Sequence, residues 1–579
     1  MKKFLFLLLV ISFISCDRSK SKNFKTVFEI SNGTKSAAYE EGIEWWQNFA
    51  GEFREVQMQE FGMTDAGYPL HIITLSSDGR HLDQVIKSKK SIILINNAIH
   101  PGEPDGVDAS MMLLRDILRT DKELLDSCIV VCIPYYNIGG ALNRNSHSRT
   151  NQDGPEEYGF RGNAQNLDLN RDFVKCDSRN AESFAKLLQI LDPDMYVETH
   201  VSNGADYQYT MTYLSTQPDK LGYEMGTYLR EGIIPNLEKK MEAKGNAMVP
   251  YVNHWGGPLD KGYATFYDSP RYSSGLTTLH SIFGFITETH MLKPFDQRVK
   301  ATYDYLMSSI EFCNENSSEI KRVRALQKKT ISQAQSLPID WNLDSDKQDT
   351  LQFKGYEYGY KKSDISGKDR LYYDRAKPTT KTMFYQGYMK ENKRRLKPYA
   401  YILRRGFTGV EDRLRWNGVE LTKLENDTTI QVVSFKILDF KTSENPYEKH
   451  YLHYNTSTSI DTMVWQFRKG DYLIKMGTEK DRFILEMLEP EGPDSYFNWN
   501  FFDAILQQKE HFSTYVFEDR AAELLRKNPE LKAKLDLQIL INTDSRGSMT
   551  ASEQLEWIYL HSPHYEKEHN RLPIFKLMR

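Results

Sequence analysis

Short apolar runs alternate with stretches of helical spacing between residues 41 and 316, and this alternation restricts the fold more than any other feature. The apolar runs are strand-like and lie at 70–75, 92–95, 129–134, 195–199 and 285–287. The helical stretches between and after them include 181–191, 220–244 and 296–313. Strands that alternate with helices are typical of a mostly parallel sheet covered by helices. We therefore predict an α/β domain with a mixed, mostly parallel sheet over residues 41–318.

The sequence changes character after this domain. Residues 319–379 are first charged and helix-prone and then polar with scattered glycines, which favours a connector. Strand-like runs follow at 399–403, 430–437, 451–454 and 472–475, and helical stretches at 518–527 and 530–537. We predict a β-rich accessory domain with terminal helices over residues 380–579.

The amino terminus has the pattern of an export signal. Lys2 and Lys3 precede an apolar stretch at 4–13, which is too short to span a bilayer as a helix. The small residue before Cys16 and the polar segment after it resemble a bacterial lipoprotein processing site, which implies that Cys16 is acylated. We predict a signal peptide at 1–16, a tether at 17–40 and an exported, membrane-anchored protein of the cell envelope, on the periplasmic or outer-membrane face. Plain secretion with an incidental cysteine is the alternative.

The charge balance argues against one class of partner. The chain has 75 basic and 79 acidic residues and a formal net charge of -4. Binding to nucleic acid depends on a local or overall surplus of positive charge. We therefore expect no nucleic-acid partner.

Two candidate metal ligands follow the apolar run at 92–95. His100 and Glu103 flank Pro101-Gly102, and of the fourteen histidines only His100 has a carboxylate three residues later. The carboxyl ends of strands in open α/β sheets are where sites are built. Zinc accepts imidazole nitrogen and carboxylate oxygen, and catalytic zinc sites have three protein ligands. A third ligand is therefore expected elsewhere.

Two other strand ends supply the missing groups. His200 closes the run that begins at Met195, which makes it the natural third ligand for one zinc ion. Glu288 follows another apolar run. Apolar surroundings raise the pKa of a carboxyl group, and a nearby metal lowers it again. A glutamate whose pKa is set by these two opposing effects can take a proton from a metal-activated water and deliver it to a leaving amine.

A stretch between the ligands is rich in arginine. Arg149 and Arg161 precede Asn170 and Arg171 in the chain. The planar guanidinium group matches a carboxylate, so Asn170 with Arg171 could clamp the free carboxyl group of a substrate. A further arginine could stabilise the oxyanion of a tetrahedral intermediate. Taken alone, these residues could equally be solvated loop charges.

Four motifs follow one another in the chain: His100-x-x-Glu103, Asp168-Leu-Asn170-Arg171, His200 and Thr287-Glu288. In this order they resemble the zinc metallocarboxypeptidases of the carboxypeptidase A and T kind, over roughly residues 41–315. The resemblance implies a zinc ion held by His100, Glu103 and His200. It also implies that Glu288 is the general base and acid, and that Asn170 and Arg171 clamp the terminal carboxylate.

The resemblance implies further roles as well. Asp168 would accept a hydrogen bond from the His100 ring and fix its tautomer. Arg149 is the favoured match for the oxyanion arginine of the family, and Arg161 competes with it. Tyr267 and Tyr272 are both available as the tyrosine that covers the substrate.

The function expected from the resemblance is release of C-terminal residues from peptides. One alternative is a zinc amidase or deacylase that acts on cell-wall stem peptides or N-acyl amino acids. The other is a binding lipoprotein without catalytic activity, and the presence of Glu288 argues against it.

Overall fold

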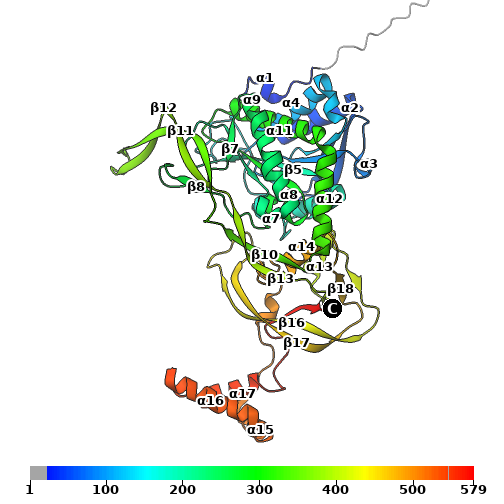
Figure 1. The fold of residues 1–579 in the computed structure, drawn as a ribbon, viewed down its shortest axis with the longest axis vertical. Helices are drawn as coiled ribbons and strands as arrows, with labels where there is room; N and C mark the ends of the chain where they lie inside the picture. The colour runs from blue at the N-terminus through cyan, green and yellow to red at the C-terminus, as the bar shows by residue number, and fades with distance from the viewer. Residues whose placement is uncertain (1–22, 546, 579) are drawn as a thin grey trace, which may run out of the picture.

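The computed structural model describes residues 23–545 and 547–578 (Figure 1). The expected signal peptide, with Cys16, and the first residues of the tether lie outside the described residues. No helix in the described part of the chain combines the length and apolar character needed to cross a membrane.

An eight-stranded mixed sheet forms the N-terminal body, in the order β1-β2-β4-β3-β5-β9-β6-β7. Its strands are β1 (Val56–Met63), β2 (Pro69–Leu75), β3 (Ser91–Asn96), β4 (Cys128–Ile133), β5 (Met195–Ser202), β6 (Met211–Ser215), β7 (Met248–Pro250) and β9 (Phe283–His290). The four central strands β4, β3, β5 and β9 are parallel, whereas β1, β2 and β6 join by antiparallel pairing. The predicted fold class of a mixed, mostly parallel sheet is confirmed.

Helices cover both faces of this sheet, which explains why β3 and β4 are almost continuously apolar. Ile93 and Ile95 belong to the core under one helical layer, and Ile92 and Leu94 to the core under the other, because successive strand residues point to opposite faces. The first layer contains α2 (Tyr39–Glu52), α4 (Asp105–Thr120) and α11 (Phe295–Glu315). The second contains α6 (Arg179–Leu191) and α10 (Ser273–Leu279). Shorter helices are α1 (Val27–Ile30), α3 (Leu82–Val85), η1 (Lys122–Leu125), α5 (Ile138–Leu142) and η2 (Leu169–Arg171).

The prediction of a single helix over residues 220–244 is wrong. The chain there forms α7 (Pro218–Leu221), α8 (Tyr223–Thr227), the π-helical turn η3 (Tyr228–Ile233) and α9 (Ile234–Ala243). Gly222 separates the first two with a φ of +91°, and a Cβ there would lie 2.6 Å from the side chain of Gln327. A left-handed glycine ends one helical segment and lets the next start in another direction.

Regular structure also fills the segment 319–379 that we expected to be a connector. It contains most of α12 (Ser317–Gln333), then β10 (Ser336–Leu343), β11 (Asp349–Lys362) and the start of β12 (Asp369–Gln386). β11 and β12 form a long hairpin, and β12 also pairs with β8 (Gly262–Ala264) of the N-terminal body. Most side chains of the hairpin are at least partly exposed, so its strands lack the apolar alternation that reveals a strand in a sequence. The division of the chain into domains stays a prediction.

The C-terminal region is β-rich, as predicted; its last helices are followed by a final strand, which returns to the sheet (Figure 1). Its six-stranded sheet has the order β15-β18-β14-β19-β16-β17. The strands of the region are β13 (Met389–Leu396), β14 (Ala400–Leu403), β15 (Thr422–Lys423), β16 (Thr428–Thr442), β17 (His453–Phe467), β18 (Tyr472–Lys475) and β19 (Arg571–Leu577). The helices are α13 (Thr408–Trp416), α14 (Asp481–Leu488), η4 (Asp503–Leu506), α15 (Thr514–Lys527), α16 (Pro529–Ser545) and α17 (Ala551–Leu560).

The C-terminal sheet shares an apolar core with the N-terminal body. One continuous cluster of buried side chains contains Leu94 of the large sheet, Leu187 of α6, and Tyr401, Phe483 and Tyr496 of the C-terminal region. The packing of these side chains ties the two regions together. The C-terminal region therefore packs directly against the large sheet and α6 of the N-terminal body.

Candidate active site

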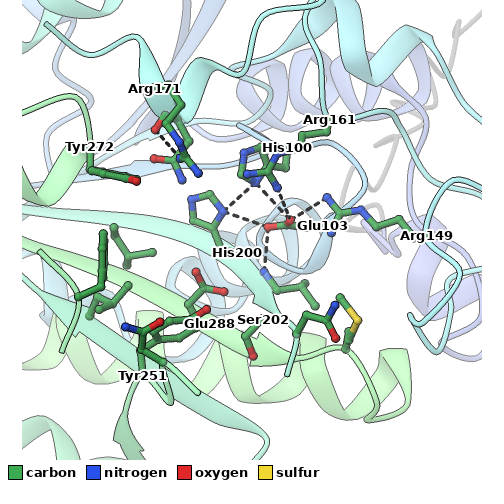
Figure 2. Close-up of a pocket in the computed structure, with 18 of the residues that line it drawn as sticks. His100, Glu103, Arg149, Arg161, Arg171, His200, Ser202, Tyr251, Tyr272 and Glu288 are labelled. Atoms are coloured by element: carbon green, nitrogen blue, oxygen red, sulfur yellow. Dashed lines mark hydrogen bonds and ion pairs between the residues drawn. The ribbon is translucent and has the colours of Figure 1, made fainter. Parts of the chain in front are cut away.

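The predicted site residues lie at the carboxyl ends of three neighbouring parallel strands. His100 and Glu103 follow β3, and His200 and Glu288 lie near the ends of β5 and β9. In the register of β5 and β9, His200 is directly opposite Glu288, so both side chains point to the same face. All four line a cavity of about 480 Å³ (Figure 2).

The three predicted metal ligands converge on one point. One ligand atom from each of His100, Glu103 and His200 lies within 4.8 Å of the other two. The Nδ1 atoms of the two histidines are 3.1 Å apart, and they lie 3.2 and 3.0 Å from the carboxylate oxygens of Glu103. Ligands at about 2.0–2.1 Å from a tetrahedral metal are about 3.3 Å from each other. The spacing of the three groups therefore suits a zinc ion.

The outer nitrogens of both imidazole rings are bound to carboxylates. His100 Nε2 lies 2.9 Å from Asp168 Oδ1, and His200 Nε2 lies 2.6 Å from Glu198 Oε1. A carboxylate accepts, so each Nε2 carries the proton and each Nδ1 presents a lone pair. Two imidazole Nδ1 atoms only 3.1 Å apart need a cation between them, either a proton on one ring or a metal ion bound by both. The donor set therefore fits a metal ion.

Electrostatics around the ligands favour a cation as well. Burial raises the pKa of Glu103, but Arg149 and His100 outweigh it and hold that pKa well below its ordinary value. Burial lowers the pKa of His200, but hydrogen bonds to Glu103 and Glu198 raise it to about 10. The carboxylates that stabilise a proton on His200 would equally stabilise a metal ion in its place.

The turn after β3 is shaped to bring Arg149 to Glu103. Arg149 Nη2 lies 2.7 Å from Glu103 Oε1, and the backbone N–H of Val201 donates to Oε2 at 2.9 Å. A Cβ on Gly102 would lie 2.6 Å from Arg149 Nε. Glycine at this position is therefore what allows the guanidinium group to pass.

Glu288 has the properties of a group that exchanges protons near neutral pH. Its side chain is half-buried and lines the cavity beside the ligands. Burial raises its pKa to about 7, with His200 and Arg161 opposing and Glu103 adding to the rise. A carboxyl group with such a pKa can accept and return a proton within one reaction cycle.

Asn170 and Arg171 lie on the short helical turn η2 at the rim of the cavity. Asn170 Oδ1 is buried and has no hydrogen-bond partner among the described residues. The guanidinium of Arg171 lies 4.6 Å from the centre of the Tyr272 ring, and 4.0 Å separates its Nη1 from Asp168 Oδ2. Both side chains therefore keep polar atoms available for a group bound in the cavity.

Arg149 and Arg161 both line the cavity but have different partners. Arg149 is engaged with Glu103, as described above. Arg161 donates from Nε to Asp168 Oδ2 at 2.9 Å, and its Nη1 lies 3.8 Å from Glu103 Oε1. Arg161 also lowers the pKa of Glu288, so its charge acts on the side of the cavity where Glu288 lies. The geometry therefore leaves both arginines as candidates for stabilising an oxyanion.

The two tyrosines expected near the substrate are placed differently. Tyr272 lines the cavity under Arg171. Tyr267 does not: its hydroxyl donates to Asp340 of β10 at 3.3 Å, and its ring lies 5.1 Å from Lys220 Nζ. The neighbouring side chain of Phe266 lines the cavity instead. Of the two tyrosines, the structure therefore places Tyr272 in the cavity lining and turns Tyr267 towards β10.

Sequence reasoning missed two residues of the site. Glu198, the partner of His200, lies two positions before it in β5 and therefore on the same face of the strand. That spacing was a usable signal. Tyr251 lines the cavity directly after β7, and burial followed by the charge of Glu288 raises its pKa above the ordinary value. Nothing in the sequence places β7 beside β6, so Tyr251 carried no such signal.

No protein-family model matches the chain, and no curated protein matches it in sequence. Among solved structures, it is similar to a metallo-carboxypeptidase from Burkholderia cenocepacia, with 14% identity over 48% of this chain and 70% of that one, at a TM-score of 0.37. It is also similar to a metallo-carboxypeptidase from Pseudomonas aeruginosa, solved with (2-guanidinoethylmercapto)succinic acid. The identity is 14% over 49% of this chain and 70% of that one, and the TM-score is 0.37. Carboxypeptidase A from Helicoverpa armigera has 14% identity over 51% of this chain and 74% of its own, with a TM-score of 0.35. We base the function proposed below on the site and not on these likenesses.

Proposed function

We propose that this chain is a zinc-dependent metallocarboxypeptidase that releases C-terminal residues from peptides. The observation that carries the proposal is one cavity that combines a converging three-ligand set with two side chains, Asn170 and Arg171, that can bind a carboxylate. His100, Glu103 and His200 would hold the metal, and Arg171 with Asn170 would hold the substrate terminus.

The chemistry divides between the metal and Glu288. A zinc ion in such a site lowers the pKa of a bound water towards about 7 and polarises a carbonyl oxygen. Glu288, which lines the cavity beside the three ligands, takes a proton from the attacking water. It then gives that proton to the departing amine as the carbon–nitrogen bond breaks. Arg149 or Arg161 would stabilise the negative charge on the former carbonyl oxygen.

The position of the clamp decides which bond is cut. The planar guanidinium of Arg171 can pair with both oxygens of a free carboxylate, and the ring of Tyr272 supports it from one side. Asn170 lines the same cavity, and the amide nitrogen of its side chain can donate to the same carboxylate. A terminal carboxylate held there places the last peptide bond of the substrate beside the ligands and Glu288.

The experiment that tests the proposal measures metal content and product together. Purified protein and a His100→Ala variant are dialysed against zinc, and zinc per chain is measured beside the release of terminal amino acids. Peptides with free and amidated C-termini, N-acyl amino acids and muropeptides are compared. We expect one zinc per chain, release from free-terminus peptides, and loss of both in the variant. Cleavage confined to N-acyl amino acids or muropeptides would instead identify a deacylase or amidase.

We also propose that the protein is exported and anchored to the cell envelope through a lipid on Cys16. The support comes from the sequence: a basic start, an apolar stretch and a cysteine that follows one small residue, Ser15. Two or more acyl chains give stable anchoring where one does not. Such an anchor would hold the site among the peptides of the envelope.

A further inference from the structure

A loop of the C-terminal sheet reaches the rim of the candidate active site. The loop comprises residues 443–452, between β16 and β17. Glu448 Oε2 accepts a hydrogen bond from the backbone N–H of Asp168 at 2.8 Å. His450 Nε2 lies 2.7 Å from Asp177 Oδ2, and the guanidinium of Arg271 lies 5.5 Å from the ring centre of Tyr447. The loop therefore touches three segments of the N-terminal body.

The tip of this loop is a tight turn held in a strained conformation. Tyr447 N donates to His450 O at 2.7 Å, and His450 N donates to Tyr447 O at 3.1 Å. Between them, Glu448 and Lys449 have φ values of 49° and 77°. Turns with two left-handed central residues strongly favour asparagine and glycine, so a glutamate and a lysine there store strain. Strain of this kind persists where surrounding contacts fix the backbone, and the contacts of Glu448 and His450 are such contacts.

Asp168, the residue that Glu448 holds, connects the metal ligands to the clamp. Its Oδ1 accepts from His100 Nε2 and from the backbone N–H of Asn170, each at 2.9 Å. The second of these bonds caps η2, the turn that carries Asn170 and Arg171. A shift of the Asp168 backbone would therefore move a ligand histidine and the clamp at the same time.

The far end of the same stretch is fastened by the C-terminal region too. Asp172, which follows Arg171, is completely buried and accepts from Lys175 Nζ at 2.7 Å. Lys175 also donates to Asp177 at 3.0 Å. Asp177 in turn binds His450 and, at 3.0 Å, Arg413 of α13. Both ends of residues 168–177 are thus tied to side chains of the C-terminal region.

Tyr272, which supports Arg171 from the other side, is also held in place by the C-terminal region. Arg271 donates from Nε to Asp494 Oδ1 at 2.8 Å, and its guanidinium lies 4.9 Å from the ring centre of Trp499. The next residue in the chain is Tyr272, whose ring lies under Arg171. The C-terminal region therefore fixes Arg171 from its own turn and from the tyrosine beside it.

We propose that the 443–452 loop is a positioning element for the carboxylate clamp, and that Glu448 is its principal positioning residue. By holding the Asp168 backbone, Glu448 keeps η2 in the orientation in which Asn170 and Arg171 face the cavity. The C-terminal region thereby takes part in substrate recognition without touching the substrate. This inference rests on the proposed function, because it assigns the clamp to a substrate carboxylate.

The test uses the full-length, zinc-loaded protein with three variants. Glu448→Ala removes the acceptor for Asp168 N–H. Glu448→Gln keeps a carbonyl acceptor of the same length and is the conservative variant. Glu444→Ala removes an exposed carboxylate from the same loop and is the matched control.

Two measurements are made on each protein. The first is the ratio of KM values for one peptide with a free and with an amidated C-terminus, together with kcat. The second is hydrogen exchange of the amides of residues 168–172, which needs no substrate. For Glu448→Ala we expect about a tenfold loss of the preference for the free carboxylate, mainly in KM, and faster exchange at Asp168. Glu448→Gln should restore most of both, and Glu444→Ala should match the parent.

The outcomes separate this inference from the function on which it rests. If the parent prefers the free carboxylate and Glu448→Ala keeps that preference and the slow exchange, the positioning role is refuted and the carboxypeptidase stands. If the parent shows no preference, the proposed function fails, and the exchange of Asp168 still decides whether Glu448 holds the turn. An equal loss of kcat and equally faster exchange in all three variants, the matched control included, would mean that the loop only stabilises the fold.

Discussion

The buried carboxylate of Glu198 gives the sharpest quantitative prediction for the metal site. Glu198 is completely buried, accepts from His200 Nε2 at 2.6 Å, and also accepts from the hydroxyl of Tyr196. A Glu198→Gln variant keeps the size and one carbonyl acceptor but loses the negative charge. The bond to His200 then changes from charge-assisted to neutral, and the ring becomes a weaker ligand.

The size of the effect follows from the strength of such a bond. Hydrogen bonds to charged groups contribute about 1.5–3 kcal/mol, compared with about 1 kcal/mol for neutral ones. The difference of about 0.5–2 kcal/mol corresponds to zinc binding about two to thirty times weaker, since about 1.4 kcal/mol is tenfold. Glu198→Ala leaves His200 and Tyr196 without that acceptor, and we expect about a hundredfold loss.

The assay is competition for zinc against a chromogenic chelator at fixed pH. Circular dichroism of the metal-free proteins provides the control, because a fold lost in the absence of metal would explain weaker binding without any role for the hydrogen bond. Zinc affinity equal to that of the parent in both variants, with the fold intact, would refute our reading of Glu198 as the group that orients His200.

Three further predictions concern the clamp, the core and the anchor. Arg171→Ala should raise KM for free-terminus peptides about a hundredfold and leave zinc content unchanged, and an unaltered KM in the hydrolysis assay would contradict the clamp. Burial raises the pKa of Asp108 to about 7, so its ionisation costs stability as the pH rises from about 4 to about 7. The free energy of unfolding of Asp108→Asn, relative to that of the parent, should therefore rise with pH over this range by at most about 4 kcal/mol. Melting temperatures of the two proteins measured at each pH would show this rise, and a constant difference between them would contradict the raised pKa. Cys16→Ser should move the protein from the membrane to the soluble fraction of cells, which blotting of the two fractions would show.

The strands and their polar ends were predictable because their physics is local. Buried parallel strands have continuous apolar runs, and His100, His200 and Glu288 stand directly at the ends of such runs. The arrangement of these ends along one sheet edge then follows from the topology of parallel strands. The convergence of the three proposed ligands could therefore be predicted without knowledge of any contact between distant segments.

What the sequence could not show depends on contacts between distant segments. The β11–β12 hairpin is exposed along most of its length and is held by pairing rather than by burial, so no apolar pattern marks it. Tyr267 and Tyr272 were equivalent in the sequence because only the packing of Tyr267 against β10 turns it away from the cavity. The bond between Glu448 and Asp168 joins residues 280 positions apart, and neither residue type signals such a partner.

The most direct test of the central claim is the Glu288→Gln variant, studied for zinc content and for peptide cleavage in the same preparation. Glutamine fills the same space but cannot take a proton from water. The account predicts one zinc per chain in parent and variant, and a loss of kcat of at least about a hundredfold for release of the terminal residue. A variant that binds zinc and cleaves as fast as the parent would contradict the mechanism proposed for this site.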